Sequence, residues 1–205
     1  MNSDRPNINH IYTIMTQLLN GTTKQLAFFL ESLLPSLIND WWHQSVVNKL
    51  SFQQRRRLEQ QNITSLSQLD LAALVRVLDQ NWYQISTKLD LTAEARHFVK
   101  EMQTVRNRWA HAGTEKFAIE DIYRDLDTIQ RFASAISANE DFLNEVCATK
   151  ASLLAKVVNS NMDENAGLNT SVGIDERKAE RGYPLSSTCD IMQEKASIIM
   201  EDLYN

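Results

Sequence analysis

Apolar residues recur at spacings of three and four between residues 69 and 89, and this pattern constrains the fold more than any other feature. They are Leu71, Leu74, Val75, Leu78, Trp82, Ile85 and Leu89. Because an α-helix turns once in about 3.6 residues, this spacing places all of them on one face. We therefore expect one amphipathic core helix over residues 69–89, with Ser67 and Asp70 assisting its start.

The same spacing predicts further helices over residues 7–20, 22–34, 92–109, 118–137 and 139–159. We expect Gly21 to end or kink the first, a threonine at 22 or 23 to cap the second and Thr92 to cap the next. Pro35 is expected to stop a helix or to open one. The chain has only 5 Gly and 3 Pro in 205 residues, which favours an all-α protein. Short connections make neighbouring helices antiparallel, so the prediction is an antiparallel helical bundle.

The composition changes after residue 158. Residues 159–185 are rich in Asn, Ser, Gly, Asp and Lys, and their apolar residues follow no period. This texture predicts a flexible linker between a bundle at 7–158 and the C-terminal segment at 186–205. The C-terminal segment regains helical spacing, and such a helix buries its apolar face on its own bundle, on a second protomer or on a partner.

Composition also limits the function. The chain has 2 cysteines, Cys147 and Cys189, which stand far apart and in no ligand spacing, so we expect neither a disulfide framework nor a zinc site. No apolar run is long enough to span a membrane, so we expect a cytoplasmic protein without membrane contact. The net charge of -5 means that an RNA site has to be a local basic patch. Arg55, Arg56 and Arg57 form a charge run that indicates a solvated face, with phosphate binding as the alternative.

The segment Arg106-Asn107-Arg108-Trp109-Ala110-His111 carries the chemistry if the chain is an enzyme. Histidine exchanges protons near neutral pH, and arginine is a permanent cation that fits a phosphate. Together they suit attack of an RNA 2′-hydroxyl on its own phosphate, with His111 as base, Arg106 holding the phosphorane charge and Asn107 orienting either partner. One histidine supplies one proton-transfer group, so two facing chains complete the site. The alternative is that the arginines are solvated and His111 is a helix-end cation.

Geometry adds a condition to this hypothesis. Residues five apart on a regular helix lie about 140° apart, so Arg106 and His111 converge only where the helix ends or distorts near Ala110. Arg108 and Trp109 are the candidate RNA-binding residues. Arg108 has a surface role as its alternative, and Trp109 falls on the apolar stripe, where core or dimer packing competes with base stacking.

The blocks around this motif resemble the HEPN family, the nucleotide-binding domains of higher eukaryotes and prokaryotes. The resemblance is to the subgroup named after the transcript-surveillance endonuclease Swt-one. The similarity covers roughly residues 8–154, and it is most specific in four blocks: Leu69 to Leu78, Asn81-Trp82, Val105 to His111, and Glu120 to Ile129.

The resemblance implies a dimer with facing motifs and RNA cleavage without metal or other cofactor, leaving a cyclic phosphate and a 5′-hydroxyl. It implies Arg106 as the family arginine, Asn107 as its polar follower and His111 as the family histidine. Bacterial relatives often precede large ATPases or helicases tied to phage defence, so we expect a toxin or effector whose partner is an antitoxin or such an ATPase. Some HEPN domains only bind, which keeps open a non-catalytic dimerisation or RNA-binding module controlled by a partner.

Overall fold

The structure, a computed structural model, describes residues 8–112 and 117–165. These residues form helices and short helical turns and contain no strand, which confirms the all-α prediction. The long elements are α1 (Ile8–Leu37), α2 (Phe52–Gln60), α3 (Leu71–Gln80), α4 (Trp82–Leu89), α5 (Ala93–Ala110), α6 (Ile119–Ala135) and α7 (Glu140–Asn165). The short turns are η1 (Trp42–Val46), η2 (Val47–Lys49) and η3 (Leu66–Gln68).

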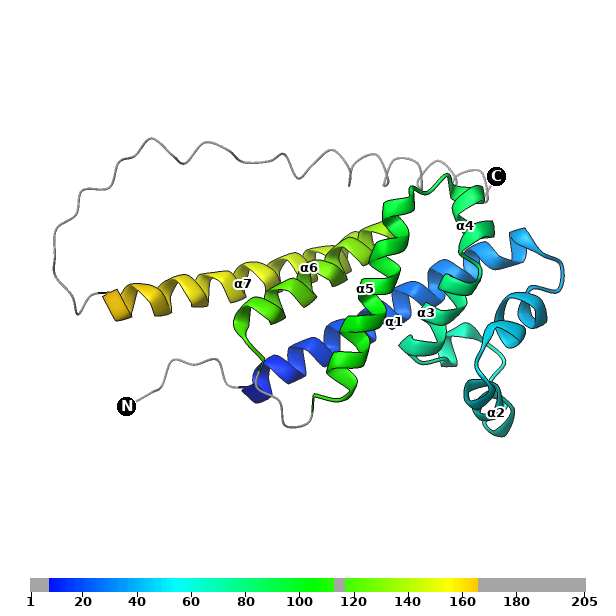
Figure 1. The fold of residues 1–205 in the computed structure, drawn as a ribbon, viewed down its shortest axis with the longest axis horizontal. Coiled ribbons are helices and arrows are strands. Elements are labelled where there is room, and N and C mark those ends of the chain that lie inside the picture. The colour runs from blue at the N-terminus through cyan, green and yellow to red at the C-terminus, as the bar shows by residue number, and fades with distance from the viewer. Residues whose placement is uncertain (1–7, 113–116, 166–205) are drawn as a thin grey trace.

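The longest helix, α1, runs diagonally through the molecule, and the other helices pack around it (Figure 1). Helices α6 and α7 lie side by side and antiparallel, and α6 also packs on α1 and α5. At the other end α3 and η3 pack on α1, with α4 and α2 beyond them. Helix α5 crosses α1 steeply and contacts both α3 and α6, so its C-terminal end is supported from both halves.

The core is built from the predicted apolar stripes. The buried apolar residues of α3, α5 and α6 include Leu71, Leu74, Val75 and Leu78 of α3, Ala95, Val99, Met102 and Val105 of α5, and Ile122, Leu126, Ile129 and Phe132 of α6. Burying a large aliphatic or aromatic side chain stabilises the fold by about 1.5–3 kcal/mol. No helix in the described ranges is long and apolar enough to cross a bilayer.

Helix α1 is continuous through Gly21 and contains Pro35, so the predicted break and the predicted second helix are wrong. Thr22 and Thr23 do not cap a helix; their hydroxyls donate to the carbonyls of Leu18 and Leu19 within α1. Gly21 serves packing instead of termination. A Cβ on Gly21 would lie 2.3 Å from Cε2 of Phe142, so the missing side chain lets the Phe142 ring of α7 lie directly on α1.

We expect Gly21→Ala to lower the free energy of unfolding by about 1–2 kcal/mol, because overpacking against Phe142 exceeds the gain in helix propensity. Urea unfolding measures the change. Asn20→Ala is the matched control, since Asn20 is exposed on the same helix. A Gly21→Ala protein as stable as Asn20→Ala would contradict the close contact between α1 and α7.

The helix predicted over residues 69–89 is two helices, because Asn81 interrupts it. The buried Asn81 amide donates to the carbonyls of Val77 and Ser45, both at 2.7 Å, and so joins the α3 end to η1. Asp70 caps α3 directly by accepting from the Ala73 N–H at 2.9 Å.

Other local predictions had mixed outcomes. Thr92 stands at the N-cap position of α5, but its side chain accepts no capping hydrogen bond. Arg55, Arg56 and Arg57 are exposed, as the charge run predicted. Helix α7 continues to Asn165, so the linker predicted from residue 159 does not begin there. The rest of that linker and the helix predicted at 186–205 lie outside the described residues.

Candidate active site at the end of helix α5

Helix α5 ends at Ala110, and His111 is its C-cap residue. The His111 backbone leaves the α-helical region, with φ -110° and ψ 6°, while its N–H still bonds to the Arg108 carbonyl at 3.3 Å. This is the helix end near Ala110 that the motif requires, and that prediction is confirmed. The last turn before His111 is therefore tightened, because this N–H bonds to the carbonyl three residues back instead of four.

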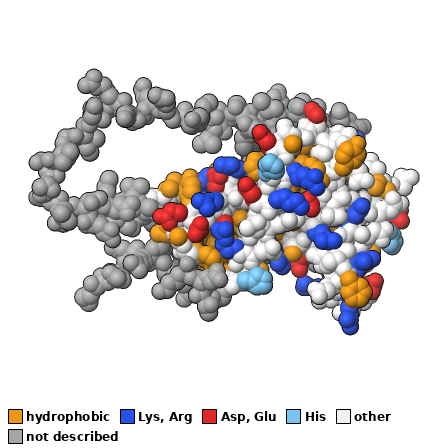
Figure 2. All heavy atoms as spheres, in the orientation of Figure 1, with side chains coloured by type: hydrophobic (Ala, Val, Ile, Leu, Met, Phe, Trp, Pro, Cys, Tyr) orange, Lys and Arg blue, Asp and Glu red, His pale blue; other side chains and the backbone are white. Residues whose placement is uncertain are grey.

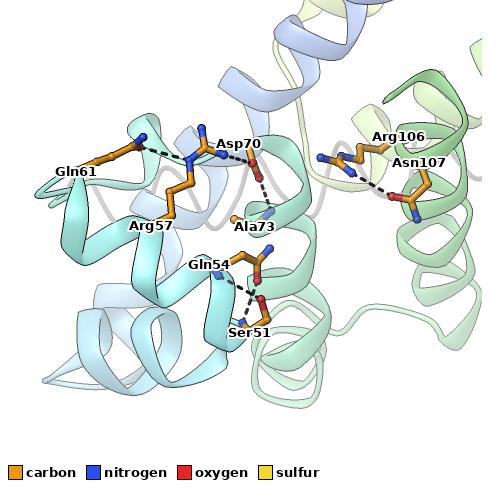
Figure 3. A network of polar contacts seen from close by, with 8 residues as sticks. All are labelled: Ser51, Gln54, Arg57, Gln61, Asp70, Ala73, Arg106 and Asn107. Atoms are coloured by element: carbon orange, nitrogen blue, oxygen red, sulfur yellow. Dashed lines mark hydrogen bonds and ion pairs between the residues drawn. The ribbon is translucent and has the colours of Figure 1, made fainter. Parts of the chain in front are cut away.

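Arg106 is held by its neighbour. One terminal guanidinium nitrogen donates to Oδ1 of Asn107 at 3.2 Å, as Figure 3 shows. Arg106 is partly buried and Asn107 is exposed. Asn107 thus contacts Arg106, while its orienting role stays a prediction, and the contact uses only one of the N–H groups of Arg106.

His111 is exposed. Neither of its two ring nitrogens forms a hydrogen bond with a side chain of the described residues. The structure thus brings Arg106 and Asn107 together, whereas no hydrogen bond among the described residues joins either of them to His111. An exposed imidazole is available to a substrate or to a second chain. Nothing inside this part of one chain fixes its tautomer.

Asp125 of α6 organises this helix end, and sequence reasoning missed it. Its carboxylate accepts from Arg108 Nη1 at 2.8 Å and from Trp109 Nε1 at 2.7 Å, and only 4% of the side chain is exposed. The two residues between Asn107 and Ala110 are therefore both fastened to α6. A signal existed: residue 125 lies three after Ile122 and four before Ile129, on the apolar stripe where a carboxylate needs a partner.

Arg108 and Trp109, predicted to bind RNA, are engaged inside the bundle. Arg108 forms the ion pair with Asp125 and is 30% exposed. Trp109 meets Tyr12 edge-on at 5.5 Å and Phe117 at 4.8 Å between ring centroids. Core packing of Trp109 is thus observed, and RNA binding by either residue stays a prediction.

Burial raises the pKa of Asp125 above its ordinary value of 3.8, and the Trp109 hydrogen bond and the Arg108 charge only partly oppose this. Between the two pKa values the folded chain binds more protons than the unfolded chain, so stability falls as pH rises. This contribution is complete below pH 3.8 and is lost as pH rises through the folded pKa.

We therefore expect the free energy of unfolding of wild type minus that of Asp125→Asn to fall as pH rises from about 4 through the raised pKa of Asp125. Urea unfolding at a series of pH values measures it, and the difference removes the contribution of other titrating groups. A difference that rises with pH would show that the Arg108 ion pair, instead of burial, dominates the pKa of Asp125.

The described helices form an all-α module in which α5 ends within the segment from Arg106 to His111. The model of the family described as Swt1-like HEPN matches residues 17–137, well over half of the chain and all of the segment from Arg106 to His111. The chain therefore belongs to the Swt1-like HEPN family, and a HEPN domain is a module of the nucleotide-binding or ribonuclease type. No significant match was found among curated proteins or among solved structures.

Proposed function

We propose that the protein is a metal-independent endoribonuclease of the HEPN type. The observation that carries the proposal is the end of α5, where Arg106 is held by Asn107 and His111 stands exposed on the residue that leaves the helix. Membership in a HEPN family supports the proposal, because HEPN domains are often ribonucleases.

In the proposed reaction, His111 removes the proton of an RNA 2′-hydroxyl, and the 2′-oxygen attacks the adjacent phosphorus. Arg106 balances the charge of the pentacoordinate phosphorane. The bond from phosphorus to the 5′-oxygen breaks, the leaving oxygen takes a proton, and the products are a 2′,3′-cyclic phosphate and a 5′-hydroxyl. Asn107 acts through Arg106 as a positioning residue.

One chain offers one imidazole in this segment, while the reaction benefits from both a base and an acid. We propose that two chains pair with their motifs facing, so that the second His111 protonates the leaving oxygen. The exposure of Asn107 and His111 supports this arrangement, because both are accessible to a second chain. A toxin or effector role in phage defence, restrained by an antitoxin or a large ATPase or helicase, is the biological setting that the family resemblance suggests.

Purified protein incubated with total RNA in excess chelator, with its mass measured by light scattering, tests the proposal. We expect a dimer that cuts RNA. A folded dimer that cuts nothing would instead favour the second candidate, a non-catalytic dimerisation or RNA-binding module. That candidate is favoured by one observation, namely that His111 lacks an orienting side chain within the described part of its own chain.

A further inference from the structure

A polar groove lies beside Arg106, between the start of α2, helix α3 and helix α5. Its volume is about 380 Å³, and residues of all three helices line it. They are Ser51, Gln54, Ala72, Val75, Arg76, Asp79, Lys100, Gln103, Arg106 and Asn107. In Figure 3, Arg106 extends from α5 towards α3, and Ser51 and Gln54 lie at the start of α2. The groove therefore contains the proposed phosphate-binding arginine itself.

The charge of the groove is positive on an acidic protein. Arg76, Lys100 and Arg106 contribute three cations, and Asp79 contributes the one carboxylate. The larger cavity between α5, α6 and α7, about 800 Å³, is lined by four basic and four acidic side chains. On the face shown in Figure 2, Lys and Arg lie along the middle over α5 and mix with Asp and Glu towards α6 and α7. An anion thus finds a net positive lining in the smaller groove.

Arg76 and Lys100 are each held in place by a contact with another part of the chain. Arg76 donates Nε to the Lys49 carbonyl at 2.8 Å, and among the described residues its two terminal nitrogens have no partner. Lys100 binds Asp79 at 2.7 Å, and Asp79 is 8% exposed. Such anchoring holds the donors in place before a ligand arrives, which lowers the entropy cost of binding.

The groove is continuous with the proposed cleavage site along α5. Lys100 and Arg106 are six residues apart on that helix, which is about 9 Å along its axis. Gln103 and Asn107 lie between and beside them and offer neutral hydrogen-bonding groups. This is the pairing of charge with uncharged polar groups that positions a nucleic-acid backbone without reading its sequence.

We propose that this groove binds the sugar-phosphate backbone of single-stranded RNA next to the bond that is cut, with Arg76 and Lys100 as phosphate-binding residues. The inference rests on the proposed function for the identity of its ligand. The strand runs from Arg106 along α5 towards Lys100. Arg76 approaches it from α3.

Binding of a short 2′-O-methyl oligonucleotide tests the groove apart from catalysis, because a strand without free 2′-hydroxyls cannot be cut by the proposed reaction. Fluorescence anisotropy gives the affinity over about a fourfold range of KCl concentration. Each lost phosphate contact lowers the salt slope of a single-strand complex by about 0.7. We expect Arg76→Gln to bind several-fold more weakly with a slope lower by about that amount, and Arg76→Lys to recover most of the affinity.

Arg124→Gln is the matched control. Arg124 is an exposed arginine on another core helix, where it pairs with Asp121 at 3.7 Å, and it lines the cavity of balanced charge. It carries the same change of charge away from the groove, and we expect its affinity and slope to equal those of wild type. Equal losses of affinity in Arg76→Gln and Arg124→Gln would contradict RNA binding by this groove, since they would reflect net charge alone.

Asp79→Asn is expected to strengthen oligonucleotide binding, whereas Arg76→Gln is expected to weaken it. Removing this carboxylate frees Lys100 and leaves three cations without an anion in the lining. We expect tighter oligonucleotide binding and a steeper salt slope, which a damaged fold does not produce. Unchanged or weaker binding by Asp79→Asn would overturn the proposal, as would a duplex DNA that competes as well as the single strand.

The outcomes for groove and function are distinguishable. If Arg76→Gln binds as wild type does while RNA is still cut in a His111-dependent manner, the groove is wrong and the proposed function stands. If the binding variants behave as expected but wild type cuts no RNA, the groove stands as the site of a non-catalytic RNA-binding module.

Discussion

His111→Ala is expected to lower the rate of RNA cleavage by about 10²–10⁴-fold, the usual contribution of a general acid–base group. In the proposed dimer the loss falls at the upper end, because one substitution removes both the base and the acid. Stability should change little, since His111 is exposed and no side chain of the described residues bonds to it. Initial rates on a fluorescent RNA in excess chelator measure the effect.

His97→Ala is the control for this substitution. His97 is an exposed histidine on the same helix, α5, near its first turns instead of its last. We expect it to cut at the wild-type rate. If His111→Ala, folded and dimeric, also cuts at the wild-type rate, then His111 does not transfer the proton and the assigned mechanism is wrong.

Asp125→Ala is expected to lower the free energy of unfolding by about 2–3 kcal/mol, because it leaves the Trp109 indole N–H and the Arg108 charge without their shared acceptor. The cost stays below that of a fully buried ion pair because Arg108 is 30% exposed and water reaches it. Since Trp109 and Arg108 fix the last turn of α5, cleavage should fall as well. Urea unfolding and the fluorescent RNA assay give the two values.

Asp121→Ala controls for the removal of a carboxylate from α6. Asp121 pairs with Arg124 at 3.7 Å on the surface, and exposed ion pairs contribute less than about 1 kcal/mol. If Asp125→Ala is no more destabilising than Asp121→Ala, the buried carboxylate does not fasten the end of α5 and its assigned role fails.

The sequence predicted most helices because their apolar spacing is dictated by the period of the helix. It placed α5 and α6 within a residue or two of their observed ends. It failed at Gly21 and Asn81 for the same physical reason. Gly21 lies against Phe142 and Asn81 bonds to the Ser45 carbonyl, and both contacts join residues far apart along the chain. Local helix propensity therefore does not predict the role of either residue.

The sequence supplied the candidate site residues, whose catalytic role stays a prediction, but it did not supply the residues that support them. Arg106, Asn107 and His111 share one short segment, and the helix end at Ala110 follows from the geometry that they require. Asp125 and the groove residues Arg76 and Lys100 come from other elements or earlier turns, and only the packing of α3, α5 and α6 reveals their relation to Arg106. A polar residue on an apolar stripe was the available signal for Asp125.

The chemistry of the RNA ends tests the central claim most directly. Wild-type protein is incubated with a defined RNA in excess chelator, and the ends of both fragments are identified by mass spectrometry. The proposed attack by the 2′-hydroxyl predicts a 2′,3′-cyclic phosphate on one fragment and a 5′-hydroxyl on the other. A 5′-phosphate, or cleavage that stops when metal is removed, would contradict the account.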